Sequence, residues 1–264
     1  MLGNYLYLGF ILITAIVGYL VKSLSKSGAA ATVLVGVSVL LGFELAGLLL
    51  LGVFFASSSF WSKFKASKKK HVEEKLQKGD ARDWQQVLAN GGIAAIASCI
   101  HFFTPSELSL FVFIVSIAAA NSDTWASEIG VLSKQRPFYI LHLRSVERGT
   151  SGAVSLLGST AAVLGAGLIA VFAVVLFGLP WHPWLLLAVL FGFLGNLFDT
   201  LLGALIQARF RCRKCGLETE KTVHCGESTG LIKGCRWFNN DVINASAIAL
   251  ASICALLSFK MFNS

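Results

Sequence analysis

Two carboxylates stand out because they lie near one end of an apolar stretch that is long enough to cross a membrane. The run 117–130 continues apolar residues that begin at Leu108, and it carries Asp123, Ser127 and Glu128. A carboxylate at full membrane depth costs about 2.5–3.5 kcal/mol, so such residues face protein, water or a cation. Carboxylate oxygens suit Mg²⁺, and phosphate oxygens can complete its shell. We predict the metal-binding half of a phosphoryl-transfer site; a structural ion pair or a helix-end carboxylate facing water is the alternative.

A second apolar segment, 185–207, carries polar residues in its second half. Asn196, Asp199 and Gln207 fall within roughly a 120° sector of a helix, together with Gly195 and Gly203. Small residues let helices approach closely, and the polar ones would line the same seam. We expect Asp199 to be a further Mg²⁺ ligand, and Asn196 and Gln207 to contact phosphate. Interhelical hydrogen bonding is the alternative.

The last apolar segment opens on a cluster of amides and one carboxylate. Asn239, Asn240 and Asp241 are followed by Asn244. One of the first three is expected to cap the helix, since Asn and Asp are preferred there. Asp241 and Asn244 are three apart and share a face, so Asp241 is a predicted Mg²⁺ ligand. Asn240 and Asn244 are predicted phosphate contacts.

Basic residues, glycines and hydroxyls gather before the segment 152–178. Arg144 and Arg148 precede the turn 149–152, which contains Thr150 and Ser151. A helix N-terminus with unpaired backbone N–H groups favours an anion, although a plain capped helix start is equally natural. A second polar set recurs every four residues, and we expect it to face a polar cavity together with the acidic residues above: Arg82, Gln86 and Asn90.

Cysteine and histidine cluster between two apolar segments. Cys212 and Cys215 form a Cys-x-x-Cys pair, and His224 and Cys225 follow, with Cys235 as a spare candidate. The basic residues of this loop indicate the cytoplasmic side of the membrane, where disulfides are unusual. Thiol and imidazole ligands at this spacing suit a structural zinc ion outside the reaction centre.

Composition sets the class of protein. The chain has 264 residues, of which 55% are hydrophobic and 14% are charged, against about 25% charged in soluble domains. Repeated apolar runs of about 20 residues predict an all-α integral membrane protein. The net charge of +8 is explained by a bias of basic residues toward cytoplasmic loops, and nucleic acid is not an expected partner.

About eight transmembrane helices are expected, with a single polytopic membrane domain over 1–264. The second segment is short and rich in small residues, so it is a candidate half-span or re-entrant piece. The first lacks a basic region before it and a cleavage site after it, and is expected to be a retained span. The segments are 2–21, 28–42, 45–61, 87–104, 108–131, 152–178, 185–207 and 238–259.

Positive charge predicts the topology. All but one of the 22 Lys and Arg residues lie in the alternate loops 22–27, 62–86, 132–151 and 208–237. By the positive-inside rule these loops are cytoplasmic and both termini lie outside. The polar residues of the segments then fall in the cytoplasmic half, which predicts a polar cavity open to the cytoplasm in a multi-pass plasma-membrane protein. The Cys/His loop 208–237 would lie on the same side.

The string Asp-Thr-Trp-Ala-Ser-Glu-Ile-Gly at 123–130 resembles the transmembrane-protein-19 family (DUF92-type), which includes the chloroplast phytyl-phosphate kinase. Further matches follow in the family's order at 82–92, 146–152, 192–207 and 240–244. The third of these reads Gly-Asn-Leu-Phe-Asp-Thr where the family pattern has Gly-Ser-x-x-Asp-Ser. The Cys/His loop resembles that of bacterial members and is not universal in the family, which implies that zinc lies outside the core chemistry.

The resemblance implies transfer of a phosphoryl group from a nucleoside triphosphate, CTP or ATP, to an isoprenoid (prenyl) monophosphate. One or two Mg²⁺ ions would be held by four acidic residues: Asp123, Glu128, Asp199 and Asp241. Two alternatives stay open: nucleotidyl transfer to a lipid phosphate, and a lipid or ion transporter or flippase. The sequence leaves chain length, nucleotide preference and assembly into a homo-oligomer undecided.

Overall fold

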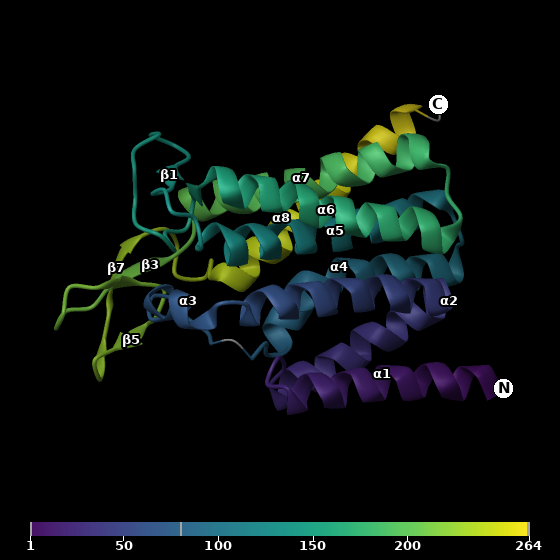
Figure 1. Ribbon diagram of the computed structural model, residues 1–264, viewed down its shortest axis with the longest axis horizontal. Helices are drawn as coiled ribbons and strands as arrows, with labels where there is room; N and C mark the ends of the chain where they lie inside the picture. Colours follow the sequence, from purple (N-terminus) through teal and green to yellow (C-terminus); the bar gives the residue numbers. More distant parts are fainter. Residues whose placement is uncertain (1, 80, 263–264) are drawn as a thin grey trace.

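A computed structural model describes residues 2–79 and 81–262, and helices dominate it (Figure 1). Eight α-helices occur within those residues. They are α1 (Leu2–Leu20), α2 (Lys26–Lys63), α3 (Ala66–Glu73), α4 (Trp84–Phe103), α5 (Glu107–Gly130), α6 (Leu156–Phe177), α7 (Trp181–Leu205) and α8 (Asn240–Phe262). Six of these are long and apolar enough to cross a membrane, namely α2 and α4 to α8, while α1 contributes a shorter apolar stretch, Tyr5–Leu20. The predicted all-α membrane fold is confirmed.

Helix α2 contains both the second and the third predicted segments. Its backbone leaves helical geometry at Glu44 (φ 50°, ψ −143°), and the two halves run in opposite directions (Figure 1). The first half extends from the loops at one end of the bundle to the opposite end, so it is neither a half-span nor re-entrant. The eight predicted apolar segments therefore occur on seven helices.

The two chain ends lie at one end of the bundle (Figure 1). The connections that hold the basic residues, 22–27, 62–86, 132–151 and 208–237, lie together at the other end. This is the arrangement that alternation of basic and non-basic loops requires. It also places the polar ends of the helices side by side.

Helix α5 is the centre of the bundle, with α4, α6, α7 and α8 packed around it. Its middle is built from small residues, and Ala118 and Ala119 are buried. Glycines of α7 lie against them: a Cβ added to Gly195 would be 2.4 Å from Cβ of Ala119, and one added to Gly192 would be 2.9 Å from Cβ of Ala118. Close approach of this kind is how membrane helices gain packing contacts. It brings Asp123 of α5 beside the polar part of α7.

Side chains cap several helix starts near the loops. Asp83 and Gln86 form a reciprocal capping box at α4, and Ser155 caps α6 by accepting from the Gly158 N–H at 3.1 Å. At α8, Asn239 Oδ1 accepts from the Val242 N–H at 3.0 Å. Asn239 is thus the capping residue of the amide cluster, which leaves its neighbours available for other contacts.

The connections between the helices contain short β-strands. The strands are β1 (Phe138–Tyr139), β2 (Ala153–Val154), β3 (Arg209–Arg211), β4 (Glu218–Thr219), β5 (Val223–His224), β6 (Glu227–Ser228) and β7 (Gly230–Lys233). All pairings among them are antiparallel: β1 with β2, β5 with β6, and a sheet in the order β4-β3-β7. The Cys/His loop therefore folds into two small sheets, one of three strands and one of two, and Phe210 on β3 is buried. These strands and α3 were not predicted.

Candidate active site

A polar cavity of about 340 Å³ lies at the loop end of the bundle. Its wall takes residues from α2, α3, α4, α5, α7, α8 and the turn before α6, and we call it the polar cavity. Most of the predicted site residues line it: Arg82, Gln86, Asn90, Asp123, Ser127, Glu128, Arg148, Thr150, Ser151, Asn196, Asp199, Asn240 and Asn244. Segments more than 160 residues apart in the sequence thus meet around one space.

Two aspartates on separate helices face this cavity, each held by an amide. Asp123 Oδ1 of α5 accepts from Asn196 Nδ2 of α7 at 3.0 Å. With its amide nitrogen turned toward the carboxylate, Asn244 of α8 donates to Asp199 Oδ2 at 2.7 Å. Asp199 is close enough to Asp123 for their charges to repel. Two half-buried acids at the wall of one cavity favour a bound cation, and their oxygens are the ligands that Mg²⁺ prefers.

The third carboxylate, Glu128, is paired with protein groups. Lys69 Nζ of α3 lies 2.5 Å from Glu128 Oε2, and Ser62 Oγ donates to Oε1 at 2.8 Å. Burial lowers the pKa of the Arg82 guanidinium, and the nearby negative charge of Glu128 partly offsets this effect. This side of the cavity therefore carries two cations against one carboxylate, which suits an anionic group.

The turn 149–152 closes the cavity beneath the loops. Gly149 and Gly152 both have positive φ, at 77° and 83°. A Cβ on Gly152 would lie 2.5 Å from Cβ of Ala204 on α7, so only glycine fits against the helix there. Thr150 and Ser151 sit between the two glycines at the cavity wall. The turn thus presents backbone and hydroxyl groups at the N-terminal side of α6.

Three predicted site residues do not line the polar cavity: Arg144, Gln207 and Asp241. Arg144 is exposed, and its backbone oxygen pairs with the Tyr139 N–H. Gln207 is buried and does not line the cavity; it accepts from Ser151 Oγ at 2.5 Å and donates to Glu220 Oε1 at 2.8 Å. Gln207 therefore holds the cavity wall together.

Asp241, the remaining predicted Mg²⁺ ligand, is occupied by a lysine. Lys78 Nζ lies 2.5 Å from Asp241 Oδ2 and 2.7 Å from Asp83 Oδ2. Burial alone would lower the pKa of Lys78, but the hydrogen bonds to Asp241 and Asp83 raise it above its ordinary value. Lys78 lines the polar cavity, whereas Asp241 is not among its lining residues. The group that faces the polar cavity here is therefore the Lys78 ammonium, which is paired with the Asp241 carboxylate.

Sequence reasoning missed three charged residues of the cavity: Lys69, Lys78 and Glu220. The lysines belong to a strongly basic loop, where their number indicates topology and hides their individual roles. Glu220 lies in the Cys/His loop, far from any motif in a span. No signal in the sequence distinguishes it from Glu218 or Glu227, which lie on the strands β4 and β6 beside it.

Glu220 gives a pH-dependent prediction. Burial raises the pKa of Glu220 from 4.5 to about 7, against the hydrogen bonds from Gln77 and Gln207. The folded protein therefore binds this proton more tightly than the unfolded chain does. The resulting stabilisation, at most on the order of 3 kcal/mol, is complete below pH 4.5 and is lost as pH rises through 7.

Glu220→Gln should raise the melting temperature at pH 8 without Mg²⁺ and flatten the slope of melting temperature against pH between pH 5 and 8. Glu107→Gln, far from the cavity, should leave the slope unchanged; an unaltered slope in Glu220→Gln would contradict the assignment.

A second cavity of about 700 Å³ lies among the loops, and we call it the loop cavity. It shares Gly149, Thr150, Ser151 and Glu220 with the polar cavity. Four basic side chains also line it: Lys75, Arg136, Arg209 and Lys233. The turn 149–152 therefore stands between two polar spaces.

The Cys/His cluster is assembled within the loop 208–237, where Cys212 and Cys215 follow β3 and His224 and Cys225 lie at the end of β5. Ligand atoms of Cys212, Cys215, His224 and Cys225 all lie within 4.8 Å of one another, and this is the same set that the spacing predicted. The backbone N–H of Cys215 and the side chain of His224 hold the pKa of Cys212 down to about 6, which favours the thiolate that metals bind. Cys235 is not part of this group within the described residues.

Comparison with known proteins places the chain in a family. The model of the integral membrane protein family DUF92 matches residues 9–252. Protein PGR of Arabidopsis thaliana is 32% identical over 258 aligned residues, covering 88% of this chain and 87% of that protein. An uncharacterised membrane protein of Methanocaldococcus jannaschii is 35% identical over 202 residues (75% and 82% covered), and the chloroplast protein VTE6 of A. thaliana is 27% identical over 243 residues (90% and 66% covered). No solved structure matches significantly. The chain belongs to the DUF92 family of multi-pass integral membrane proteins.

Proposed function

We propose that the protein is a membrane-embedded phosphotransferase that moves a phosphoryl group from a nucleoside triphosphate, CTP or ATP, to an isoprenoid monophosphate. The observation that carries this proposal is the polar cavity, where Asp123 and Asp199 meet the basic residues Arg82, Lys69 and Lys78. Its substrate class comes from the resemblance of residues 123–130 to the family that includes phytyl-phosphate kinase.

Asp123 and Asp199 are the residues best placed to hold Mg²⁺. Both carboxylates reach the same cavity from different helices, and each keeps oxygen lone pairs beyond its single amide contact. Glu128 and Asp241 would join only after release from Lys69 and Lys78. Bound Mg²⁺ would supply charge neutralisation between phosphate oxygens. The amides of Asn196 and Asn244 fix the two carboxylates in place.

Basic side chains are proposed to balance the charge of the transferring group. Arg82, Lys69, Lys78 and Arg148 line the polar cavity around the acids. The loop cavity, with four further basic residues and a shared wall at Gly149–Ser151, is the proposed place of the donor nucleotide. Donor and acceptor phosphates would then meet at the turn 149–152, on the N-terminal side of α6.

The reaction needs no strong base. An oxygen of the acceptor monophosphate forms the new bond to the γ-phosphorus, and the bond from that phosphorus to the β–γ bridging oxygen breaks. The nucleoside diphosphate leaves with that electron pair, and the lipid diphosphate is the other product. The acceptor oxygen is already largely ionised near pH 7, since the second pKa of a phosphate is about 6. Alignment and charge compensation then account for catalysis.

The loop end of the bundle is proposed to face the cytoplasm of a plasma membrane. Its basic residues favour that side by the positive-inside rule, and nucleoside triphosphates are found there.

Incubation of purified protein with Mg²⁺, γ-labelled CTP or ATP and a panel of prenyl monophosphates tests the proposal. Label on a lipid diphosphate is the expected result. Nucleotide-linked lipid with release of pyrophosphate would instead identify a nucleotidyltransferase. Absence of turnover together with lipid movement between liposome leaflets would identify a flippase and overturn the proposal.

The Cys/His cluster is proposed to bind one structural zinc ion that holds the loop sheet. Cys212→Ser should remove about one zinc per chain, measured by elemental analysis, and lower the melting temperature, because structural zinc contributes directly to folding. Cys235→Ser is the matched control and should retain the metal. Equal zinc content in both variants would exclude this ligand set.

A further inference from the structure

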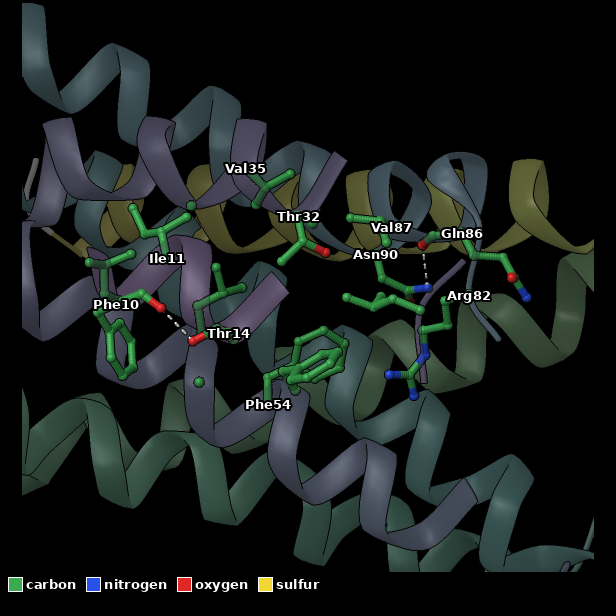
Figure 2. Close-up of a pocket in the computed structure, with 17 residues that line it drawn as sticks. Phe10, Ile11, Thr14, Thr32, Val35, Phe54, Arg82, Gln86, Val87 and Asn90 are labelled. Carbon is green, nitrogen blue, oxygen red and sulfur yellow. Dashed lines mark hydrogen bonds between the residues drawn. The ribbon is translucent and has the colours of Figure 1, made fainter. Parts of the chain in front are cut away.

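An apolar pocket of about 70 Å³ lies between α1, the two halves of α2 and the start of α4 (Figure 2). Phe10 and Ile11 of α1 stand at one end of the view, and Arg82 stands at the other. Val35 and Phe54 come from the two halves of α2. We call this space the apolar pocket.

The pocket wall offers few free polar groups. Thr14 Oγ1 donates to the Phe10 carbonyl at 2.8 Å, and Thr32 Oγ1 donates to the Gly28 carbonyl at 2.9 Å. Both hydroxyls are therefore satisfied within their own helices. The pocket accordingly suits a hydrocarbon.

Its mouth is polar and is shared with the candidate active site. Arg82, Gln86 and Asn90 line both the apolar pocket and the polar cavity. Asn90 Nδ2 is bonded to the Gln86 carbonyl at 2.9 Å, and Gln86 is part of the α4 capping box. Among the described residues, the Arg82 guanidinium makes one side-chain hydrogen bond, from Nη1 to Ser59 Oγ at 3.3 Å. Arg82 therefore keeps donors for a further acceptor at the junction of the two spaces.

We propose that the apolar pocket holds the part of the isoprenoid chain next to the phosphate of the acceptor lipid, with that phosphate at Arg82. This inference rests on the proposed function and adds where the chain lies. An apolar space that continues into a cavity with a cation at the junction matches one class of molecule, an anionic headgroup on a hydrocarbon chain. Residues at the inner end then select chain length.

The depth can be judged along α2. Gly28 packs against the Arg82 carbonyl at the level of the mouth, and Gly36 packs against Ile11 at the inner end. Eight residues of helix separate them, which is about 12 Å. A five-carbon prenyl chain therefore ends within this depth, whereas a twenty-carbon chain is longer than the pocket and must extend past its inner end.

Gly52 gives a selective test. It lines the pocket, and a Cβ added there meets no atom within 4 Å, so a larger side chain can enter the pocket without striking the backbone. Gly167 on α6 is the matched control: it is also a mid-helix glycine with open space at its Cβ, and it does not line this pocket.

The experiment compares Gly52→Leu and Gly167→Leu using a twenty-carbon and a five-carbon prenyl monophosphate. For Gly52→Leu we expect at least a tenfold rise in KM for the long chain and less than a twofold change for the short one. Gly167→Leu should change neither. Thr14→Phe narrows the pocket from α1 and should repeat the pattern. Equal effects on both chains, or none, would overturn the proposal.

A readout without substitution or turnover separates this inference from the proposed function. Wild-type protein is photolabelled with a twenty-carbon prenyl monophosphate that carries a diazirine at the chain end, and labelled peptides are mapped by mass spectrometry. Label within 2–63 or 84–103 supports the pocket even if no phosphoryl transfer is found. Label confined to α6 or α7 overturns the pocket even if transfer is observed.

Discussion

Asp123→Asn and Asp199→Asn are each expected to lower turnover by about 10²- to 10³-fold. Each change keeps the shape of the side chain but removes a carboxylate from the polar cavity, where the proposed Mg²⁺ would be held against phosphate oxygens. Folding should be retained, because the change keeps the side-chain volume and removes one of two carboxylates whose charges repel each other. Label transfer to prenyl monophosphate at saturating Mg²⁺ measures the effect.

Glu107→Gln is the control for these variants. It makes the same chemical change at the opposite end of α5, on an exposed side chain, and should leave turnover unchanged. Near-normal rates in Asp123→Asn or Asp199→Asn, with intact thermal melting, would remove that residue from the active site.

Gly195→Val is expected to lower both stability and turnover although it touches no substrate. A Cβ at this position would lie 2.4 Å from Cβ of Ala119, so α7 must move away from α5. Overpacking of this kind costs about 1–3 kcal/mol. Asp199 lies about one helical turn beyond Gly195, and a displacement of about 1 Å relative to Asp123 can cost on the order of 10² in rate.

Thermal melting and turnover of Gly195→Val should be compared with those of Gly167→Val. The control places the same side chain on α6 where a Cβ meets nothing within 4 Å. Similar losses in both variants would show that helix propensity, and not the α5–α7 contact, is responsible.

The sequence predicted the membrane fold well because apolar length and basic loops are direct signals of span number and order. It also identified the polar cavity, since Asp123, Asn196 and Asn244 are costly in lipid and must find one another. The turn at Glu44 joins two apolar runs with a single residue out of helical geometry. Its presence was predicted as a segment boundary, but its conformation was not.

The remainder depends on contacts between loops. Lys78 pairs with Asp241, and Glu220 reaches the cavity from the sheet of the Cys/His loop. Lys78 and Asp241 are more than 140 positions apart in the sequence, and Glu220 lies in a segment with no helical periodicity. Three-dimensional placement of the loops decides them, and side-chain type alone carries no such information.

Arg82, Gln86 and Asn90 line both the apolar pocket and the polar cavity, and for the proposed reaction this would have a kinetic consequence. An acceptor anchored in this way never leaves hydrocarbon during the reaction, and the product differs from it only at the headgroup. Encounter is then two-dimensional, so the rate should follow the mole fraction of acceptor in the bilayer or micelle. Adding inert detergent at constant total acceptor would slow the protein by surface dilution.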